Sequence, residues 1–533
     1  MRFAALISAL VICVVTIVAA VLSGSIVWIV IAVLFGALAA VGIHDVIQRR
    51  HSILRNYPIV GHMRFILESI RPELQQYFIE RNYDGRPYDR DTRTAIYERA
   101  KGVKDEQAYG TERDVAEPGY EWLLQSMHSS DPPKEQPRVR IGSPDCTLPY
   151  EMALLNVSAM SFGALSGNAL TALNQAAAKG GFAHDTGEGG LSPYHLKGGD
   201  VVWELGSGYF GARAKDGGFD AEEFREKASH DAVKMVSLKL SQGAKPGIGG
   251  VLPGPKVTEE IAKTRSVPKG ETCVSPPGHK VFSTPRELIR FIAHMRDLAG
   301  GKPAGFKLCV GTRHELLAIC KAMVEEQTTP DFIVVDGAEG GTGAAPAEYE
   351  DHVGTPLTEG LMMVHNALVG CDLRDRIKIG CSGKVATGSD IVKRLAQGAD
   401  YTNAARAMMQ AVGCLQTQRC NTNECPVGVA TQDPKRARAL NVPDKTERAT
   451  RYQHATVAEA QRLIASMGLH SPADVTPHHL VRRVDHARAD SYAVLYEWRA
   501  PNELLEDPPE AWIVDGERAA PDSFAPRVTT ASH

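Results

Sequence analysis

The sequence is poor in aromatic residues and almost balanced in charge. Phe, Trp and Tyr make up 6% of its 533 residues, the formal net charge is −4, and no run of basic residues is interleaved with aromatics. A nucleic-acid surface needs clustered positive charge, so the composition gives no reason to expect DNA or RNA as a partner. No G-x-G-x-x-G motif follows an early strand-like segment, so the fingerprint of a nicotinamide dinucleotide fold is also missing.

Full charge is absent from the whole stretch between residues 3 and 44. About 20 apolar residues cross a bilayer as one helix, so this stretch is long enough for two. Ser23-Gly24-Ser25 lies at its midpoint, where a tight turn would fall. We therefore predict a transmembrane helical hairpin in residues 1–44, with helices at 3–22 and 26–43. A secretory signal peptide is the alternative, although a second apolar run directly after the first is not typical of one.

Basic residues stand on both sides of this hairpin, at Arg2, Arg49, Arg50 and Arg55. The cytoplasmic flanks of membrane helices are enriched in Lys and Arg, so both ends of the hairpin are expected in the cytoplasm. Membrane lipid would then hold the chain at the cell inner membrane, with the main domain facing the cytoplasm. Residues 45–149 contain amphipathic and highly charged stretches, and we expect them to form a connector that packs on the main domain.

After Pro149 the sequence alternates short apolar segments, Gly-rich turns and stretches of helical length. Eight segments are strand candidates: 153–160, 181–190, 201–208, 235–243, 305–311, 331–341, 376–383 and 400–405. Eight βα units in about 270 residues match the size of a TIM (β/α)8 barrel, and we predict this α/β fold for residues 150–475. A doubly wound open sheet is the alternative. Residues 476–533 would form a C-terminal tail.

Glycine-rich turns follow the sixth and seventh predicted strands. In TIM barrels the loops after the late strands commonly hold a phosphate, because glycine lets backbone N–H groups approach it closely. The residues expected to cradle one phosphate are Gly340, Gly341, Thr342, Gly343, Ser382, Gly383, Ala405 and Arg406. Lys307, on the fifth predicted strand, could place a cation beside the ring of a phosphate-bearing cofactor. Taken alone, each loop could also be a turn without a ligand.

Three of the ten cysteines, Cys414, Cys420 and Cys425, fall within the single loop 413–432. Three thiols are one short of a closed tetrahedral zinc site and one more than a disulfide needs. No His lies within the loop, so a zinc site would need a distant His as its fourth ligand. A disulfide does not suit a cytoplasmic domain.

Six motifs then occur in the order known from one protein family. They are "SAMSFGALS" (158–166), "TGEGG" (186–190), "QGAKPGIGGVLPGPKV" (242–257), "SPPGH" (275–279), "GGTGAAP" (340–346) and "CNTNECPVGVATQD" (420–433). The sequence resembles the FMN-binding synthase domain of glutamate synthases over roughly 150–435, with a weaker tail to 475. The resemblance implies a TIM barrel that carries FMN and a [3Fe-4S] cluster.

The resemblance also assigns residues to the two cofactors. It places Met160 and Ser161 along the isoalloxazine of FMN, and Lys307 near the N1/O2 edge, where an ammonium stabilises the negative charge of reduced flavin. The cluster of the family takes three cysteines with the spacing C-x5-C-x4-C, which Cys414, Cys420 and Cys425 match. A three-iron cluster has one empty corner, so three thiolates suffice. The closest alternative is the zinc site with a distant His.

For the substrate, the resemblance implies that Gln242, Lys245 and Arg265 hold the two carboxylates of 2-oxoglutarate, with Glu188 nearby. Two cations suit a dicarboxylate, because guanidinium and ammonium groups pair with carboxylates. Lys245 and Glu188 are the predicted catalytic residues. The pocket loop departs from the family, which reads "GEGGQ" where this chain has Gly247-Ile248-Gly249-Gly250-Val251. An acid and an amide are replaced by two aliphatic residues, so a related 2-oxo acid is the alternative substrate.

Three functions are compatible with these features. The main hypothesis is a glutamate synthase-like oxidoreductase acting on CH-NH2 donors, in which an imino acid formed from a 2-oxo acid and ammonia receives a hydride from reduced FMN. The alternatives are an amine transferase of the N-methylglutamate synthase kind and a non-catalytic membrane electron-transfer subunit. Electrons would enter through the cluster from an external donor, either a ferredoxin-like protein or a reductase subunit. A homo-oligomer is also expected.

Full-length glutamate synthases begin with an amidotransferase domain whose N-terminal Cys hydrolyses glutamine. This sequence begins instead with Met1 and the apolar hairpin. Ammonia is therefore expected to come from solution, from a separate subunit, or as an amine bound to another donor.

Overall fold

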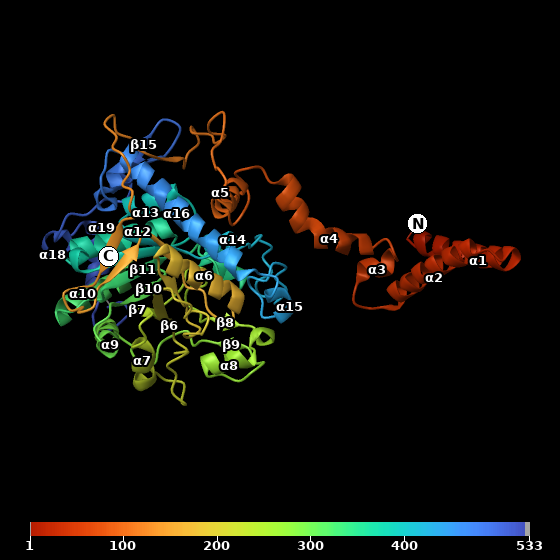
Figure 1. The fold of residues 1–533 in the computed structure, drawn as a ribbon, viewed down its shortest axis with the longest axis horizontal. Helices are drawn as coiled ribbons and strands as arrows, with labels where there is room; N and C mark the ends of the chain where they lie inside the picture. The colour runs from red at the N-terminus through yellow and green to blue at the C-terminus, as the bar shows by residue number, and fades with distance from the viewer. Residues whose placement is uncertain (1, 528–533) are drawn as a thin grey trace, which may run out of the picture. The chain divides into compact units, whose positions relative to one another are not determined.

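The computed structural model describes residues 2–527, which form two compact units (Figure 1). The first unit ends at Arg86 and the second begins at Pro87.

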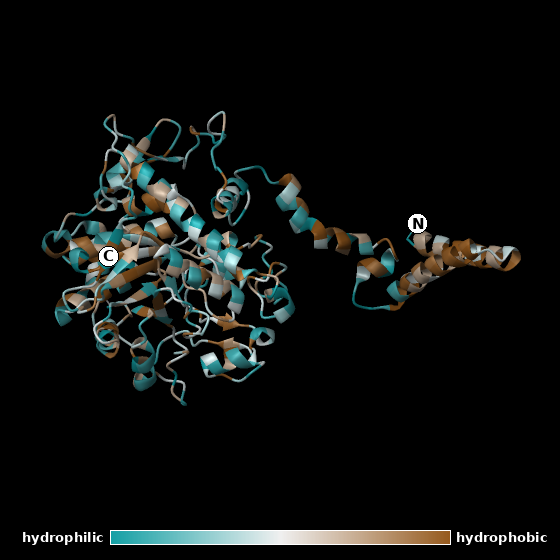
Figure 2. Ribbon diagram, in the orientation of Figure 1, coloured by the Kyte–Doolittle hydropathy of each residue, from teal (hydrophilic) through white to brown (hydrophobic). Residues whose placement is uncertain are grey.

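Two long apolar helices, α1 (Ala4–Ser23) and α2 (Ile26–Ile47), open the first unit. Gly24 joins them with a φ of 62°, a left-handed conformation that costs glycine little. Helices are thus present at both predicted positions, and each is long and apolar enough, by length and composition, to cross a membrane. Figure 2 shows both helices coloured mostly as hydrophobic.

The rest of the first unit consists of α3 (Ser52–Asn56), α4 (His62–Leu74) and the π-helical turn η1 (Gln75–Ile79). No residue of α4 or η1 is buried. The large apolar side chains that they expose are Met63, Phe65, Ile66, Leu67, Ile70, Leu74, Tyr77, Phe78 and Ile79. Most of these recur every three or four residues, which gathers them on one helix face.

Eight parallel strands close into a barrel in the second unit, and β13 pairs back with β4. They are β4 (Leu155–Val157), β5 (His184–Asp185), β6 (Val201–Leu205), β7 (Val233–Lys239), β10 (Ala304–Leu308), β11 (Phe332–Asp336), β12 (Lys378–Ser382) and β13 (Tyr401–Ala404). Each lies in or overlaps one of the eight predicted segments. The TIM barrel prediction is confirmed, and the open doubly wound sheet is wrong.

Helices surround the barrel (Figure 1). The principal ones are α6 (Gly167–Gly180), α7 (Ala221–Ala228), α9 (Pro285–Leu298), α10 (Arg313–Glu326), α12 (Leu357–Gly370), α13 (Gly388–Ala396), α14 (Arg406–Ala411) and α16 (Val442–Ser466). Helix α9 illustrates their packing, since Leu288, Ile289, Ile292 and Met295 recur at helical spacing and all are buried. This shell buries the outer face of strands such as β6, in which every residue is buried.

Shorter elements decorate the barrel. Those in its loops are β8 (Val251–Leu252), η2 (Gly254–Lys256), α8 (Glu259–Arg265), β9 (Cys273–Val274), α11 (Ala347–His352), η3 (Arg374–Arg376) and α15 (Pro434–Ala437). Those before it are α5 (Arg90–Lys101), β1 (Glu121–Leu123), β2 (Arg138–Ile141) and β3 (Tyr150–Ala153). Those after it are η4 (Pro472–Asp474), η5 (Pro477–His479), β14 (Leu480–Arg483), β15 (Ala489–Ser491), α17 (Tyr492–Leu495), α18 (Glu503–Glu506) and α19 (Glu510–Arg518).

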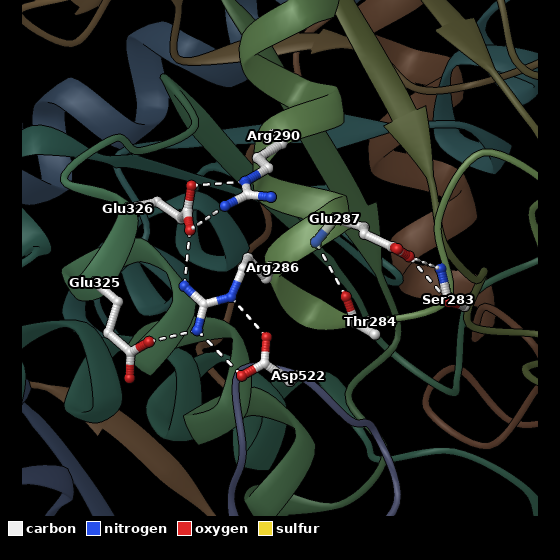
Figure 3. A network of polar contacts seen from close by, with 8 residues as sticks. All are labelled: Ser283, Thr284, Arg286, Glu287, Arg290, Glu325, Glu326 and Asp522. Atoms are coloured by element: carbon white, nitrogen blue, oxygen red, sulfur yellow. Dashed lines mark hydrogen bonds and ion pairs between the residues drawn. The ribbon is translucent and has the colours of Figure 1, made fainter.

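Residues 87–149 of the predicted connector and the segment after the barrel belong to the second unit, whereas residues 45–86 of the connector belong to the first. Strand β1 pairs antiparallel with β14, which pairs with β15, so the predicted connector and the predicted tail share one small sheet. Figure 3 shows a second attachment, in which Arg286 of α9 binds three carboxylates. Its nitrogens lie 2.5 Å from Glu325, 2.7 Å from Glu326 and 2.6 Å from Asp522 of the C-terminal segment.

Candidate active site

Four ionisable side chains meet inside the barrel, near the carboxyl ends of its strands. The Nζ atom of Lys307 on β10 lies 2.5 Å from Oε2 of Glu204 on β6. Asp185 of β5 and Asp336 of β11 are also close enough to act on Lys307. Burial alone would lower the pKa of Lys307, but the neighbouring acidic groups, Glu204 above all, raise it above its usual value, so the ammonium stays charged. Lys307 was predicted, whereas the three carboxylates were not.

Asp185 differs from its neighbours in its expected protonation. Burial and the charge of Glu204 raise the pKa of Asp185 to about 8. This carboxyl group is therefore largely protonated at neutral pH and can act as a hydrogen-bond donor or proton source. Met160, which the sequence places along a flavin ring, is buried, and its backbone N–H donates to the Asp185 carbonyl at 3.5 Å.

The glycine-rich turns after β11 and β12 lie against each other, and Arg406 contacts the first of them. The Arg406 guanidinium donates to the Glu339 carbonyl at 2.6 Å. A Cβ atom added to Gly341 would lie 2.8 Å from Arg406 Nε, so only glycine lets these two groups approach. Gly383, in the turn after β12, lies against the turn after β11, since an added Cβ would be 3.1 Å from the Leu357 side chain and 3.5 Å from the Gly337 nitrogen. The structure thus brings the predicted loops to one place beside a guanidinium.

The other residues predicted to bind the phosphate are less closely packed, or already have another partner. The Ser382 hydroxyl donates to Asp336 Oδ1 at 2.6 Å, so it is already engaged by a carboxylate. The other oxygen of Asp336 accepts the Gly243 N–H at 2.7 Å, which ties the loop after β7 to β11. Nothing lies within 4 Å of a Cβ added to Gly343, and Thr342 and Ala405 are half-buried.

The arrangement fits a phosphate-bearing group. It offers one guanidinium, backbone at glycines without side chains, and a buried cation farther inside the barrel. A phosphate needs charge-assisted donors of this kind and room for close backbone approach.

A second group of charges surrounds Glu188, in the loop after β5. Lys239 Nζ lies 2.6 Å from Glu188 Oε1 and donates to Gln242 Oε1 at 3.2 Å. Ser275 Oγ donates to Glu188 Oε2 at 3.1 Å. Burial would raise the pKa of Glu188. The charges of Lys239 and Arg265 and these hydrogen bonds nevertheless lower it to about 2. Lys239 and Ser275 were not predicted, although Lys239 precedes the recognised "QGAKPG" motif by three residues.

Lys245 and Arg265 complete this group. Lys245 Nζ donates to the Ala344 carbonyl at 2.7 Å, and burial lowers its pKa to about 8. Arg265 is buried and donates to Ser161 Oγ at 3.2 Å and to the Phe162 carbonyl at 3.0 Å. The predicted residues are therefore neighbours of Glu188, and the three cations face two carboxylates, Glu188 and Glu350, of which Glu350 acts on Lys245.

The pocket loop that departs from the family pattern packs on Glu188 through its glycines. A Cβ added to Gly250 would lie 1.9 Å from Glu188 Oε1, and one added to Gly249 would lie 1.8 Å from the Ser275 carbonyl. Of the two aliphatic residues, Ile248 is half-buried, whereas the Val251 side chain in β8 is 37% exposed.

The cysteine loop presents three free thiols, with Cys425 buried and Cys414 and Cys420 half-buried. Burial raises the pKa of Cys414 to about 12, and that of Cys420 is raised as well. Within residues 2–527 no group of three or more His, Cys, Asp or Glu side chains is arranged to hold a metal ion. The structure thus supplies the donors on one loop without a preformed site.

One lysine that the sequence analysis missed lies beside this loop. Lys256 is buried, and its Nζ atom donates to the carbonyls of Ala164 at 3.0 Å, Cys420 at 3.2 Å and Ala430 at 3.4 Å. Its ammonium lies close enough to Cys420 to oppose the rise that burial causes in the pKa of that thiol.

The comparison with protein families decides the assignment. A family model described as a conserved region in glutamate synthase matches residues 136–470, which is more than half of the chain. The chain belongs to the glutamate synthase family of oxidoreductases. The resemblance seen in the motifs is confirmed.

Individual relatives agree with this assignment. The glutamate synthase large subunit-like protein YerD of Bacillus subtilis is 38% identical over 495 residues, which is 85% of this chain and 94% of that protein. The archaeal-type glutamate synthase [NADPH] of Thermotoga neapolitana is 36% identical over 59% of this chain and 59% of its own length. A glutamate synthase [NADPH] large chain of Azospirillum brasilense is 32% identical, and the match spans 20% of that protein.

Solved structures give a weaker likeness. A mandelate oxidase with (S)-4-hydroxymandelic acid matches with a TM-score of 0.42 and 13% identity, over 75% of this chain and 91% of that one.

Proposed function

We propose that the barrel catalyses a glutamate synthase-type reaction, in which an imino acid formed from a 2-oxo acid and ammonia is reduced to an amino acid. The observation that carries the proposal is the group of charges around Glu188. Three cations there face two carboxylates, Glu188 and the Glu350 side chain that acts on Lys245, which leaves net positive charge for a dicarboxylate such as 2-oxoglutarate or a related 2-oxo acid.

FMN, when bound, would supply the hydride chemistry that no side chain can provide. Arg406 and the backbone at Gly340, Gly341 and Gly383 would hold its phosphate. Lys307 would keep a fixed positive charge inside the barrel, because its raised pKa prevents deprotonation.

The chain's own residues would bind the substrate and handle its proton. Lys245 and Arg265 would hold the carboxylates, and Lys239 would keep Glu188 ionised and in place. Asp185, with a pKa of about 8, can hold a proton on its carboxyl group at neutral pH and release it to a developing amine.

Cys414, Cys420 and Cys425 would bind the [3Fe-4S] cluster, which can carry single electrons from an external donor. The proposal rests on the donor set, since thiolates are the ligands that iron–sulfur clusters prefer. Lys256 would supply a positive charge beside the thiolates. Because no preformed site exists in the described structure, binding of the cluster would also order the loop.

The reaction can be tested by following flavin reoxidation without oxygen. The reduced full-length protein should be reoxidised by 2-oxoglutarate together with ammonium, and by neither alone. Replacing Lys245 with Met should raise the half-saturating 2-oxo acid concentration about 10- to 100-fold, because a charged hydrogen bond contributes about 1.5–3 kcal/mol. In the wild type this concentration should also rise as the pH passes about 8, where Lys245 loses its proton.

The matched control is Lys302→Met. Lys302 also donates to backbone carbonyls, those of Ala228 at 2.6 Å and His230 at 3.1 Å, but it precedes β10 at the opposite end of the barrel. This variant should behave as wild type. Amine transfer between two amino acids without flavin reoxidation would instead favour the transferase alternative and refute the proposed reaction.

We also propose that the first unit attaches the protein to a membrane. Helices α1 and α2 are long enough to cross it, and the exposed apolar face of α4 and η1 suits the boundary between headgroups and acyl chains. Arg64 and Arg71 of α4 could contact anionic headgroups.

Membrane attachment predicts how the protein fractionates. The full-length chain should sediment with membranes and resist extraction by carbonate, whereas a chain that begins at Pro87 should stay in the supernatant and keep its flavin colour. Fractionation followed by flavin absorbance would measure both. Cleavage of the full-length chain near Ser23, with export of the remainder, would contradict the proposal and support a signal peptide.

A further inference from the structure

The short segment 87–101 precedes the region that the family model matches, 136–470, yet it lies at both proposed cofactor positions. Its residue Tyr88 contacts Arg406, which is proposed to hold the flavin phosphate, and Tyr97 contacts the cysteine loop. The inference below rests on the proposed function, because it concerns the FMN that the barrel would bind.

Tyr88 is packed directly against the Arg406 guanidinium. Its side chain is 5% exposed, and the central carbon of the guanidinium lies 5.5 Å from the centre of its ring. Burial raises the pKa of Tyr88 to about 12 although the Arg406 guanidinium opposes this rise, which shows that the hydroxyl also lies near the guanidinium charge. Together with the Glu339 carbonyl and the bare backbone of Gly341, Tyr88 fixes where the Arg406 charge lies.

Tyr88 is itself fixed by a pair of hydrogen bonds to Gln416 in the cysteine loop. The Tyr88 N–H donates to Gln416 Oε1 at 3.3 Å, and Gln416 Nε2 donates to the Tyr88 carbonyl at 3.2 Å. Gln410 of α14 donates to the same Oε1 atom at 3.3 Å. The Gln416 amide thus satisfies both the N–H and the C=O of Tyr88, as a neighbouring strand in a β-sheet would, and this fixes the Tyr88 backbone.

Helix α5 adds a second attachment to the same loop. The Tyr97 hydroxyl donates to the Cys414 carbonyl at 2.8 Å. The helix starts firmly, since Asp89 accepts the Thr92 N–H at 2.8 Å as an N-terminal cap.

We propose that Tyr88 is a positioning residue for the flavin phosphate, which acts through Arg406 and is held in place by Gln416. Residues outside the family-matched region would thus complete the phosphate site. A guanidinium restrained on several sides loses less side-chain entropy when it binds a phosphate, so the restraint increases affinity.

Riboflavin provides the decisive probe, because it has the flavin ring but no phosphate. The flavin-free full-length protein in detergent would be titrated with FMN and with riboflavin, following the quenching of flavin fluorescence. Tyr88→Phe removes the hydroxyl and keeps the ring, and it should weaken FMN binding about 3- to 10-fold. Gln416→Leu should weaken FMN binding similarly. Neither variant should change the affinity for riboflavin.

Two controls isolate the route through Arg406. Tyr150→Phe removes a hydroxyl that donates to Asp200 at 2.9 Å, at the amino-terminal end of the barrel, and it should bind both flavins as wild type does. In an Arg406→Met background, Tyr88→Phe should cause no further loss of FMN affinity, because the residue has nothing left to position.

Unchanged FMN affinity in Tyr88→Phe and Gln416→Leu would overturn the inference. An equal loss of riboflavin affinity would also overturn it, since that result indicates a general structural defect. A wild-type chain that binds riboflavin and FMN equally would refute the phosphate site but leave a flavin enzyme. A wild-type chain that binds neither flavin would refute the proposed cofactor, and the inference with it.

Discussion

Replacing Gly341 with Val should leave the purified protein without its flavin. The new Cβ atom would lie 2.8 Å from Nε and 2.9 Å from Cδ of Arg406, so the guanidinium would have to move away from the glycine-rich turns. Loss of a charge-assisted contact and of close backbone approach should cost about 3 kcal/mol, which is about 100-fold in FMN affinity. Flavin absorbance of the purified full-length protein, followed by FMN titration, measures this loss.

Gly311→Val is the matched control for this substitution. Gly311 follows β10 at the same end of the barrel, and the one atom near its added Cβ is a Glu315 oxygen at 3.5 Å, an ordinary contact distance. This variant should retain FMN. Full flavin content in Gly341→Val, with wild-type affinity, would show that the turns after β11 and β12 do not hold the phosphate.

The barrel could be predicted because each strand carries its own local signal. In a parallel sheet covered by helices, the strands are short apolar runs, and the turns between them are marked by glycine. Strand β6, for example, is buried along its whole length and appears in the sequence as an apolar run interrupted by Glu204. Glu204 was not predicted from this interruption, which in any case does not reveal the partner of the residue.

Which side chains the site residues contact is decided by how the strands pair when the barrel closes. Glu204 and Lys307 are about a hundred residues apart, on β6 and β10, with β7 between them. Their ion pair follows from the register of three strands, which no local pattern specifies. The motifs identified Gln242 and Lys245, whereas Lys239 became visible only when its contact with Glu188 was known.

Tyr88 illustrates the same limit over a longer distance. It pairs with Gln416, more than three hundred positions later, and neither residue lies in a motif typical of phosphate binding. The sequence of the charged segment around it indicates only a solvated connector. The positioning role proposed for Tyr88 could be inferred only from its buried position in the folded chain.

For the cysteine loop, the sequence predicts a metal cluster, whereas the described structure contains no arranged set of ligands for one. The spacing of Cys414, Cys420 and Cys425 matches the family's cluster ligands, but the described structure holds no arranged metal group. Thiols with raised pKa values become ligands only after losing their protons, so iron must compete with protons for them. The loop is therefore expected to take its final geometry when the cluster binds.

Replacing Cys420 with Ser should remove the cluster and leave the flavin. Wild-type protein purified without oxygen should contain about three irons and four sulfides per chain. The variant should lose most of this iron, together with the EPR signal of the oxidised three-iron centre, because a hydroxyl is a hard and poor substitute for a thiolate at iron. Its FMN content should stay near that of wild type, since Arg406 and Gly341 are unchanged.

Flavin reduction distinguishes a working cluster from a structural one. If electrons enter through the cysteine loop, reduction of FMN by a ferredoxin-like protein donor should slow at least about tenfold in Cys420→Ser. Reduction by dithionite, a small reductant that can reach the flavin directly, should be unaffected. Cys146→Ser is the control, because Cys146 is also a half-buried free thiol but lies before β3, outside the loop. Zinc in place of iron in the wild type would refute the cluster. Wild-type reduction rates in the iron-free variant would instead refute its role as the entry point for electrons.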